Sequence, residues 1–196
     1  MSLHANTDGT LSSVAGAAGA LSYVDLGTDT EDHALGGTGP SSLLFETAPL
    51  ASDVRIEGLP RLEVEASTLG TETHYTPVLF DLGPPVSVDP SLCTFVTASN
   101  ACTITRGFLN ARYRDGLSSG VDLSPGARYH ASVRFIDNDW VVRAGHRIAV
   151  AVMSSNVWWA MPDAERAQNT IFVGAGGTAL VLPVVGGSDA AAAAGL

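Results

Sequence analysis

The chain contains no lysine. All ten basic residues are arginines, and twenty acidic residues give the 196-residue chain a net charge of −10. Repulsion of the phosphate backbone would remove the main source of affinity for nucleic acid, so a nucleic-acid-binding protein is excluded as an interpretation. The acidic residues are scattered along the chain, so they do not form the block that would indicate an acidic tail.

Long apolar runs are also missing. No stretch approaches the roughly twenty apolar residues that a membrane-spanning helix needs. No positively charged segment followed by an apolar run opens the chain, as a secretory signal would. We therefore expect no association with a membrane.

Histidine is sparse, and its placement predicts no zinc site. The five histidines are dispersed and show none of the ligand spacings of zinc proteins; they are His4, His33, His74, His130 and His146.

Cysteine is limited to two residues, Cys93 and Cys102, which bracket a hairpin with Ser99 and Asn100 near its tip. Strand pairing across that tip would bring the two thiols together, so we expect a disulfide, with two buried free thiols as the alternative. A disulfide would favour an exported protein, and its absence a cytoplasmic one.

Apolar and polar residues alternate with a period of two through much of the sequence. Residues 61–67 place Leu62, Val64 and Ala66 on one face, and residues 148–152 do the same with Ile148, Val150 and Val152. The turn at residues 124–126 launches a strand that points Tyr129, Ala131, Val133 and Phe135 inward. These two runs, in residues 123–155, indicate an antiparallel sheet, with a turn expected at residues 137–139.

Further strands are expected at residues 76–82, 93–97, 103–114, 169–173 and 179–185. In the longest of them, Leu109, Ala111 and Tyr113 should face inward. Only residues 162–168 could form a helical turn. This spacing of strands predicts an all-β protein, a jelly-roll β-sandwich.

Composition predicts three segments along the chain. Residues 1–40 include a small-residue tract at 14–20 and a Gly-, Thr- and Asp-rich stretch at 27–40, so they are expected to be a linker or irregular segment. The jelly roll should occupy residues 41–186. The alanine-rich residues 187–196 are expected to be a tail.

A serine-hydrolase motif can be read in the chain. Residues 116–120 fit the Gly-x-Ser-x-Gly pattern around Ser118, with Asp137 or Asp139 and then His146 in the order of an α/β-hydrolase triad. That motif requires a strand that turns into a helix, whereas another turn follows here. We interpret it as a Gly/Ser loop, and His146, which shares the parity of Ile148, as a structural residue at the sheet margin.

Calcium is the candidate cofactor, because many jelly-roll domains bind it. Asp137, Asn138 and Asp139 could supply oxygens, and Glu46, Asp53 and Asp81 are further candidate ligands from elsewhere in the chain. Two carboxylates on one turn fall short of the six or more ligands that calcium takes, so we predict a solvated turn and no cofactor.

The pair Trp158 and Trp159 has three interpretations: core filling, a seam with a partner domain, or a platform on which a sugar stacks. The adjacent strand also carries Ala149, Ala151 and Met153 on its second face, which indicates that something covers that face.

Several segments together resemble a known family. They are residues 43–50 with Asp53 and Gly58, then 62–67, 105–114, 123–126, 145–148, Ser154 and Ser155, 169–171 and 180–183. In order and spacing they resemble the C-terminal, non-catalytic domain of the X-Pro dipeptidyl-peptidase and cocaine-esterase (CocE/NonD) family of serine hydrolases.

The resemblance implies a galactose-binding-like jelly roll that accompanies an α/β-hydrolase domain with a Ser-Asp-His triad of its own. The chain would then be an accessory domain that braces the catalytic domain and helps to form its substrate entrance. Trp158, Trp159 and Met161 would lie at the interface, and a homo-oligomer is compatible with this arrangement. The alternative function is a carbohydrate-binding module.

Overall fold

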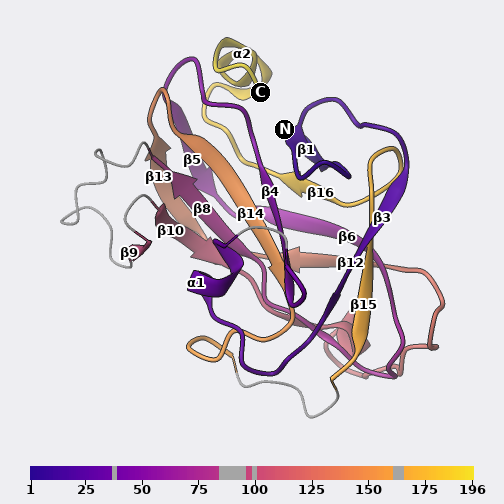
Figure 1. The fold of residues 1–196 in the computed structure, drawn as a ribbon. Helices are drawn as coiled ribbons and strands as arrows, with labels where there is room; N and C mark the ends of the chain where they lie inside the picture. The colour runs from indigo at the N-terminus through magenta and orange to yellow at the C-terminus, as the bar shows by residue number, and fades with distance from the viewer. Residues whose placement is uncertain (37–38, 84–95, 99–100, 161–165) are drawn as a thin grey trace.

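Antiparallel strands are the main secondary structure of the computed structural model, which describes residues 1–36, 39–83, 96–98, 101–160 and 166–196 (Figure 1). Of residues 96–98 only the backbone is described. Every ladder between named strands is antiparallel. The prediction of an all-β protein is confirmed; the jelly-roll connectivity stays a prediction.

A seven-stranded sheet forms one layer. Its strands run in the order β2-β1-β16-β6-β15-β3, and β12 pairs with β6 from the other side. The bounds are β1 Ser2–Ala5, β2 Leu11–Ser12, β3 Gly19–Val24, β6 Arg61–Thr68, β12 Tyr129–Arg134, β15 Gln168–Val173 and β16 Ala179–Val181.

A five-stranded sheet in the order β4-β14-β8-β10-β9 forms the second layer. Its strands are β4 Ser42–Glu46, β8 Val78–Leu82, β9 Val96–Ala98, β10 Ala101–Arg106 and β14 Arg147–Met153. The two strands predicted in residues 123–155, β12 and β14, are both antiparallel to their neighbours but lie in different sheets.

Two short ladders complete the strand set. They pair β5 Val54–Gly58 with β13 Asn138–Val142, and β7 His74–Tyr75 with β11 Leu109–Asn110. The expected turn at residues 137–139 was therefore wrong in part, because Asn138 and Asp139 begin β13.

One core lies between the two main sheets. Leu62 and Val64 of β6 face Val150 and Val152 of β14 across it, all of them buried. This is the alternation that the sequence predicted, and burial of such side chains is worth about 1.5–3 kcal/mol each. The shared core is what a β-sandwich requires.

The second face of β14 is covered by the chain itself. Ala149, Ala151 and Met153 form a separate buried cluster that includes Ala34, with Leu35 packed against it. Ala34 ends the short helix α1, Glu31–Ala34, which begins where the Thr30 side chain accepts a hydrogen bond from His33 N. Something does cover this face, as expected, but it is α1 of the chain itself and not a partner domain.

Residues 1–40 are not an irregular linker, because β1, β2 and β3 belong to the seven-stranded sheet. The small residues at 14–20 allow a close approach of two backbone segments. A side chain at Gly174 would place its Cβ 2.0 Å from the carbonyl oxygen of Ala17. Pairing with β15, rather than side-chain burial, holds this tract in place.

The C-terminal residues are also ordered against the domain. Residues Gly187–Ala193 form helix α2, and Ala191 and Ala194 are buried. Ala51 N donates to Ala194 O at 2.9 Å. The alanine-rich segment is thus a helix docked on the body instead of a free tail.

The long strand expected at residues 103–114 is interrupted. Gly107 forms a bridge with Phe135, where a Cβ would come within 2.9 Å of Arg134 O. Asn110 then accepts a hydrogen bond from Arg112 N and starts the 3-10 helix η1, Ala111–Tyr113. As a result Ala111 is buried but Tyr113 is exposed, contrary to the alternation.

The helical turn predicted at residues 162–168 falls mostly outside the described residues, and Gln168 begins β15. Among the helices of the described part, none has the length and apolar character to cross a bilayer.

Candidate functional site

The Trp158–Trp159 turn follows directly on β14, and both indoles face solvent. Trp158 is 69% exposed and Trp159 is 44% exposed. Val157, before them, is exposed as well, while Met161 lies outside the described residues. The interpretation of the pair as core filling was therefore wrong.

Asn156 anchors the backbone of the Trp158–Trp159 turn. It is wholly buried, and its carbonyl oxygen accepts hydrogen bonds from Trp159 N and Ala160 N, each at 2.8 Å. A bridge between Asn156 and Ala160 closes the turn. The exposed indoles thus project from a fixed base.

The residues before the turn have partners on β3 and β15. Ser154 Oγ lies 3.0 Å from the hydroxyl of Tyr23 and accepts from Asn169 Nδ2 at 3.1 Å. Ser155 Oγ donates to the carboxylate of Asp25. Burial raises the pKa of Tyr23 far above its ordinary value, so this hydroxyl stays neutral.

A buried ion pair flanks the turn on its other side. Glu31 of α1 is 2% exposed and accepts from both Arg106 and Thr103. Asn156 Nδ2 donates to the same carboxylate at 3.0 Å. The guanidinium of Arg106 also lies over the ring of Trp159. The ion pair therefore links α1, β10 and the aromatic turn.

Sequence reasoning missed the acidic members of this site. Asp25, Asp29 and Glu31 lie in or beside the stretch at residues 27–40 that was interpreted as a loop. The available signal was Thr30 followed by Glu31 and Asp32, the acidic first turn of a capped helix.

The residues of the hydrolase-like motif lie in different environments. His146 Nδ1 is 2.7 Å from Asp81 Oδ1, and the side chains of both are largely buried. Both carboxylate oxygens of Asp139 accept from Arg55. Ser118 lies in an exposed turn that no helix follows. The interpretation of His146 as a structural residue agrees with this geometry.

The carboxylates suggested for calcium are occupied by other partners. Asp53 accepts from Ala144 N and Arg143, and those donors lower its pKa. Asp81 also accepts from Trp140 Nε1 at 2.9 Å. Within the described residues, no group of three or more histidine, cysteine, aspartate and glutamate side chains is arranged to hold a metal ion.

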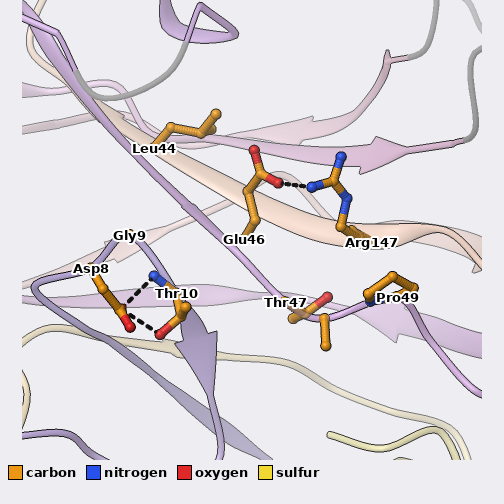
Figure 2. A pocket seen from close by; sticks show the side chains of 9 residues that line it. Asp8, Gly9, Thr10, Leu44, Glu46, Thr47, Pro49 and Arg147 are labelled. Atoms are coloured by element: carbon orange, nitrogen blue, oxygen red, sulfur yellow. Dashed lines mark hydrogen bonds and ion pairs between the residues drawn. The ribbon is translucent and has the colours of Figure 1, made fainter.

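A groove of about 680 Å³ opens between the loop of Asp8 to Thr10 and β4 (Figure 2). Glu46 and Arg147 form an ion pair along its wall, and Asp8 accepts from Thr10 within the loop. Glu46 and Arg147 are thus paired with each other, and the Asp8 carboxylate is bound by neutral donors.

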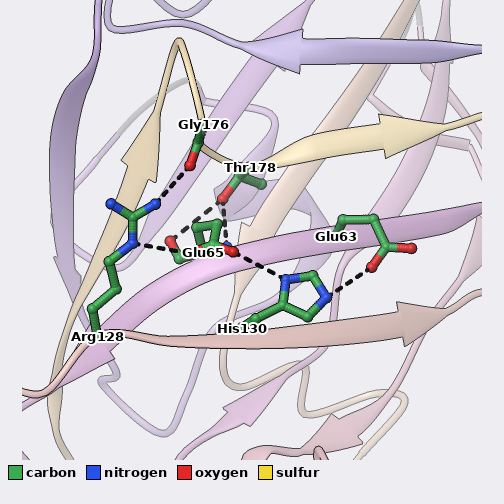
Figure 3. Close-up of polar contacts among 6 residues, drawn as sticks. All are labelled: Glu63, Glu65, Arg128, His130, Gly176 and Thr178. Carbon is green, nitrogen blue, oxygen red and sulfur yellow. Dashed lines mark hydrogen bonds and ion pairs between the residues drawn. The ribbon is translucent and has the colours of Figure 1, made fainter.

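The outer face of the seven-stranded sheet carries a chain of charges (Figure 3). The ring nitrogens of His130 lie 3.3 Å from Glu63 and 3.1 Å from Glu65. Arg128 contacts Glu65 and also donates to Gly176 O at 2.6 Å. Exposed ion pairs of this kind contribute little to stability, so we interpret these charged side chains as part of a solvated surface.

Cys102 is buried in β10. Its expected partner, Cys93, lies outside the described residues, so the disulfide stays a prediction.

Comparison with known proteins identifies the family. Residues 5–176 match the family model of the X-Pro dipeptidyl-peptidase C-terminal non-catalytic domain. A protein of Streptomyces avermitilis named as an Xaa-Pro dipeptidyl-peptidase is 27% identical over 174 residues, which cover 74% of this chain and 25% of that protein.

Solved structures show the same fold. An alpha-amino acid ester hydrolase superposes with a TM-score of 0.74 at 20% identity, and a CocE/NonD family hydrolase from Staphylococcus aureus with 0.73 at 14%. Each match covers 94% of this chain and 36% of the other. The chain thus spans between 25% and 36% of the length of these three proteins, and it belongs to the family of X-Pro dipeptidyl-peptidase C-terminal non-catalytic domains.

Proposed function

We propose that this domain docks on the α/β-hydrolase catalytic domain of a parent chain through the Trp158–Trp159 turn. It would brace that domain and form one wall of the substrate entrance. The observation that carries the proposal is the exposure of two adjacent indoles above a wholly buried base. Large exposed aromatic side chains are costly to leave in water and are enriched at the centres of interfaces.

The anchoring of the turn supports the same role. An interface residue that is already held in place loses less conformational entropy on binding. Here Asn156 fixes the backbone and Arg106 contacts the Trp159 ring. Tryptophan and arginine are also the residue types that most often carry binding energy.

We further propose that the parent is a hydrolase of X-Pro peptides, esters or amides. The names of the relative from S. avermitilis and of the two solved structures support this class of reaction. The choice among those substrates would belong to the catalytic domain.

Substitution in the full-length hydrolase tests the docking role. Trp158→Ala and Trp159→Ala should lower activity towards an X-Pro p-nitroanilide or an ester and should make the junction between the domains more sensitive to protease. Leu117→Ala, at a residue 84% exposed on another loop, is the matched control and should change neither. Unchanged activity and protease sensitivity in both Trp variants would count against the proposal.

A carbohydrate-binding module remains the second candidate, because a polar guanidinium lies beside the exposed ring of Trp159. Sugars stack on such rings while polar neighbours bind their hydroxyls. Saturable quenching of tryptophan fluorescence by a soluble oligosaccharide, lost in Trp158→Ala, would favour this candidate over docking.

A further inference from the structure

Three carboxylates are buried beside the aromatic turn. Asp25, Asp29 and Glu31, which we call the acidic cluster, are each at most 2% exposed. Glu31 is neutralised by Arg106. In the described residues no arginine forms an ion pair with Asp25 or Asp29, and Nδ1 of the exposed His33 lies 3.7 Å from Asp29. Burial of ionised carboxylates without matching positive charge is strongly unfavourable, so the cluster requires a further cation or a proton.

Asp25 and Asp29 have neutral donors, but not enough of them. Asp25 Oδ1 accepts from Ser155 Oγ and from Gly27 N. Asp29 has a hydrogen bond with Ser41, yet its Oδ2 is buried with no hydrogen-bond partner. Burial raises the pKa of Asp29 above its ordinary value.

The amide of Asn156 is an independent observation. Its neighbours in sequence contact the segment that carries two members of the cluster: Ser155 donates to the carboxylate of Asp25, and Val157 N donates to the backbone carbonyl of Asp29 at 3.0 Å. Its own Nδ2 binds Glu31. Asn156 therefore binds Glu31 and lies beside the segment that carries Asp25 and Asp29, and its Oδ1 is buried without a partner. Rotation of the amide would turn its oxygen towards Glu31, so the orientation is fixed.

We propose that Asp25, Asp29 and Asn156 bind one calcium ion. The donors are carboxylate and amide oxygens, the ligands that this hard cation prefers, and its flexible coordination suits a site that water completes. Sites with so few charged ligands bind calcium with a Kd of about 10⁻⁴ to 10⁻³ M. The ion would join the segment before α1 to residues 155–157 and so fix the base of the Trp158–Trp159 turn, whether or not that turn is a docking site.

Calcium titration of the whole chain tests the site. After treatment with EDTA, the melting temperature should rise saturably with CaCl₂, with a midpoint between about 0.1 and 1 mM, and less with MgCl₂ at equal ionic strength. Asp29→Asn removes a buried charge at constant volume, so it should fold and lose the response. Asp32→Asn, an exposed carboxylate of α1, is the matched control and should keep it.

Terbium luminescence gives a readout that does not depend on stability. Trp159 lies near the cluster through Arg106 and Glu31, so terbium bound there should be excited through tryptophan and displaced by CaCl₂. Asn156→Ser, a second variant, should weaken that signal. No saturable calcium response up to about 10 mM, or an equal response in Asp29→Asn, would overturn the proposal. A wild-type chain that is stabilised only by acidification would overturn it too, because a proton would then neutralise the cluster.

Discussion

The guanidinium of Arg106 lies 5.9 Å from the centre of the Trp159 ring while it also binds the buried carboxylate of Glu31. One side chain thus couples the ion pair inside the domain to an indole on its surface. A cation–π contact at an exposed site is worth about 0.5–1 kcal/mol. Its main effect here is to restrict the indole before any partner arrives.

Loss of Arg106 should be costly. Arg106→Met leaves Glu31 buried without its counter-ion, and the free energy of unfolding should fall by about 3–5 kcal/mol. The double variant Glu31→Gln/Arg106→Met should recover most of the loss. Urea unfolding measures both, and a single-variant loss below about 1 kcal/mol would contradict a buried pair.

The exposed pair of Arg55 and Asp139 is the matched control for that series. Their side chains are each about half exposed. Arg55→Ala should therefore leave the free energy of unfolding almost unchanged.

The backbone of the fold was largely predictable, and the site was predictable only in part. Alternation at Leu62, Val64 and Ala66 predicts strand β6 and its buried face because one face of each sheet meets the core. The same reasoning failed at Gly107 and Asn110, where a close backbone crossing and a side-chain cap interrupt the strand.

Small residues misled the prediction at both ends of the chain. Burial of apolar area cannot place the tract that leads to β3, because its position depends on hydrogen bonds to β15, which lies far away in sequence. The sequence singled out Trp158 and Trp159 but left core filling open, and it did not predict the base that holds them. Contacts between Asn156 and Glu31 join segments 125 residues apart, which no local pattern reports.

Acid should destabilise the domain partly through Asp53. Ala144 N and Arg143 stabilise its charged form, so the pKa of Asp53 in the folded chain lies below the ordinary value of 3.8. This contribution is complete above that value and is lost as the pH falls through the lowered folded pKa. Urea midpoints measured between pH 7 and pH 2 should therefore fall less steeply in Asp53→Asn than in the wild type.

Asp32→Asn, at an exposed position on α1, serves as the control for that series. If Asp53→Asn follows the wild-type curve over the whole range, the hydrogen bonds to Asp53 do not contribute to acid stability.

Cys93 and Cys102 should be joined in protein made in an oxidising compartment. The bridge would close a short loop, so it should add about 2–3 kcal/mol and the reduced domain should still fold. Thiol titration of the unfolded, non-reduced chain should detect no free thiol. Two titrating thiols would rule out the bridge and would favour a cytoplasmic protein.

The chain alone should not hydrolyse p-nitrophenyl esters or X-Pro p-nitroanilides above background. His146 is engaged with Asp81, and Ser118 lies on an exposed turn without the helix that an oxyanion hole of this type needs. Steady-state assays of the wild type and Ser118→Ala should coincide. Turnover by the wild type that disappears in Ser118→Ala would contradict this prediction and support a catalytic triad in this chain.

Hydroxyl-radical footprinting with mass spectrometry tests the docking claim most directly, because it reports the exposure of single side chains. Oxidation of Trp158 and Trp159 should be strong in this chain alone and suppressed in the full-length hydrolase, while the exposed Leu117 reacts equally in both. Equal oxidation of both tryptophans in the two proteins would show that the turn stays in solvent, and the proposed interface would then be wrong.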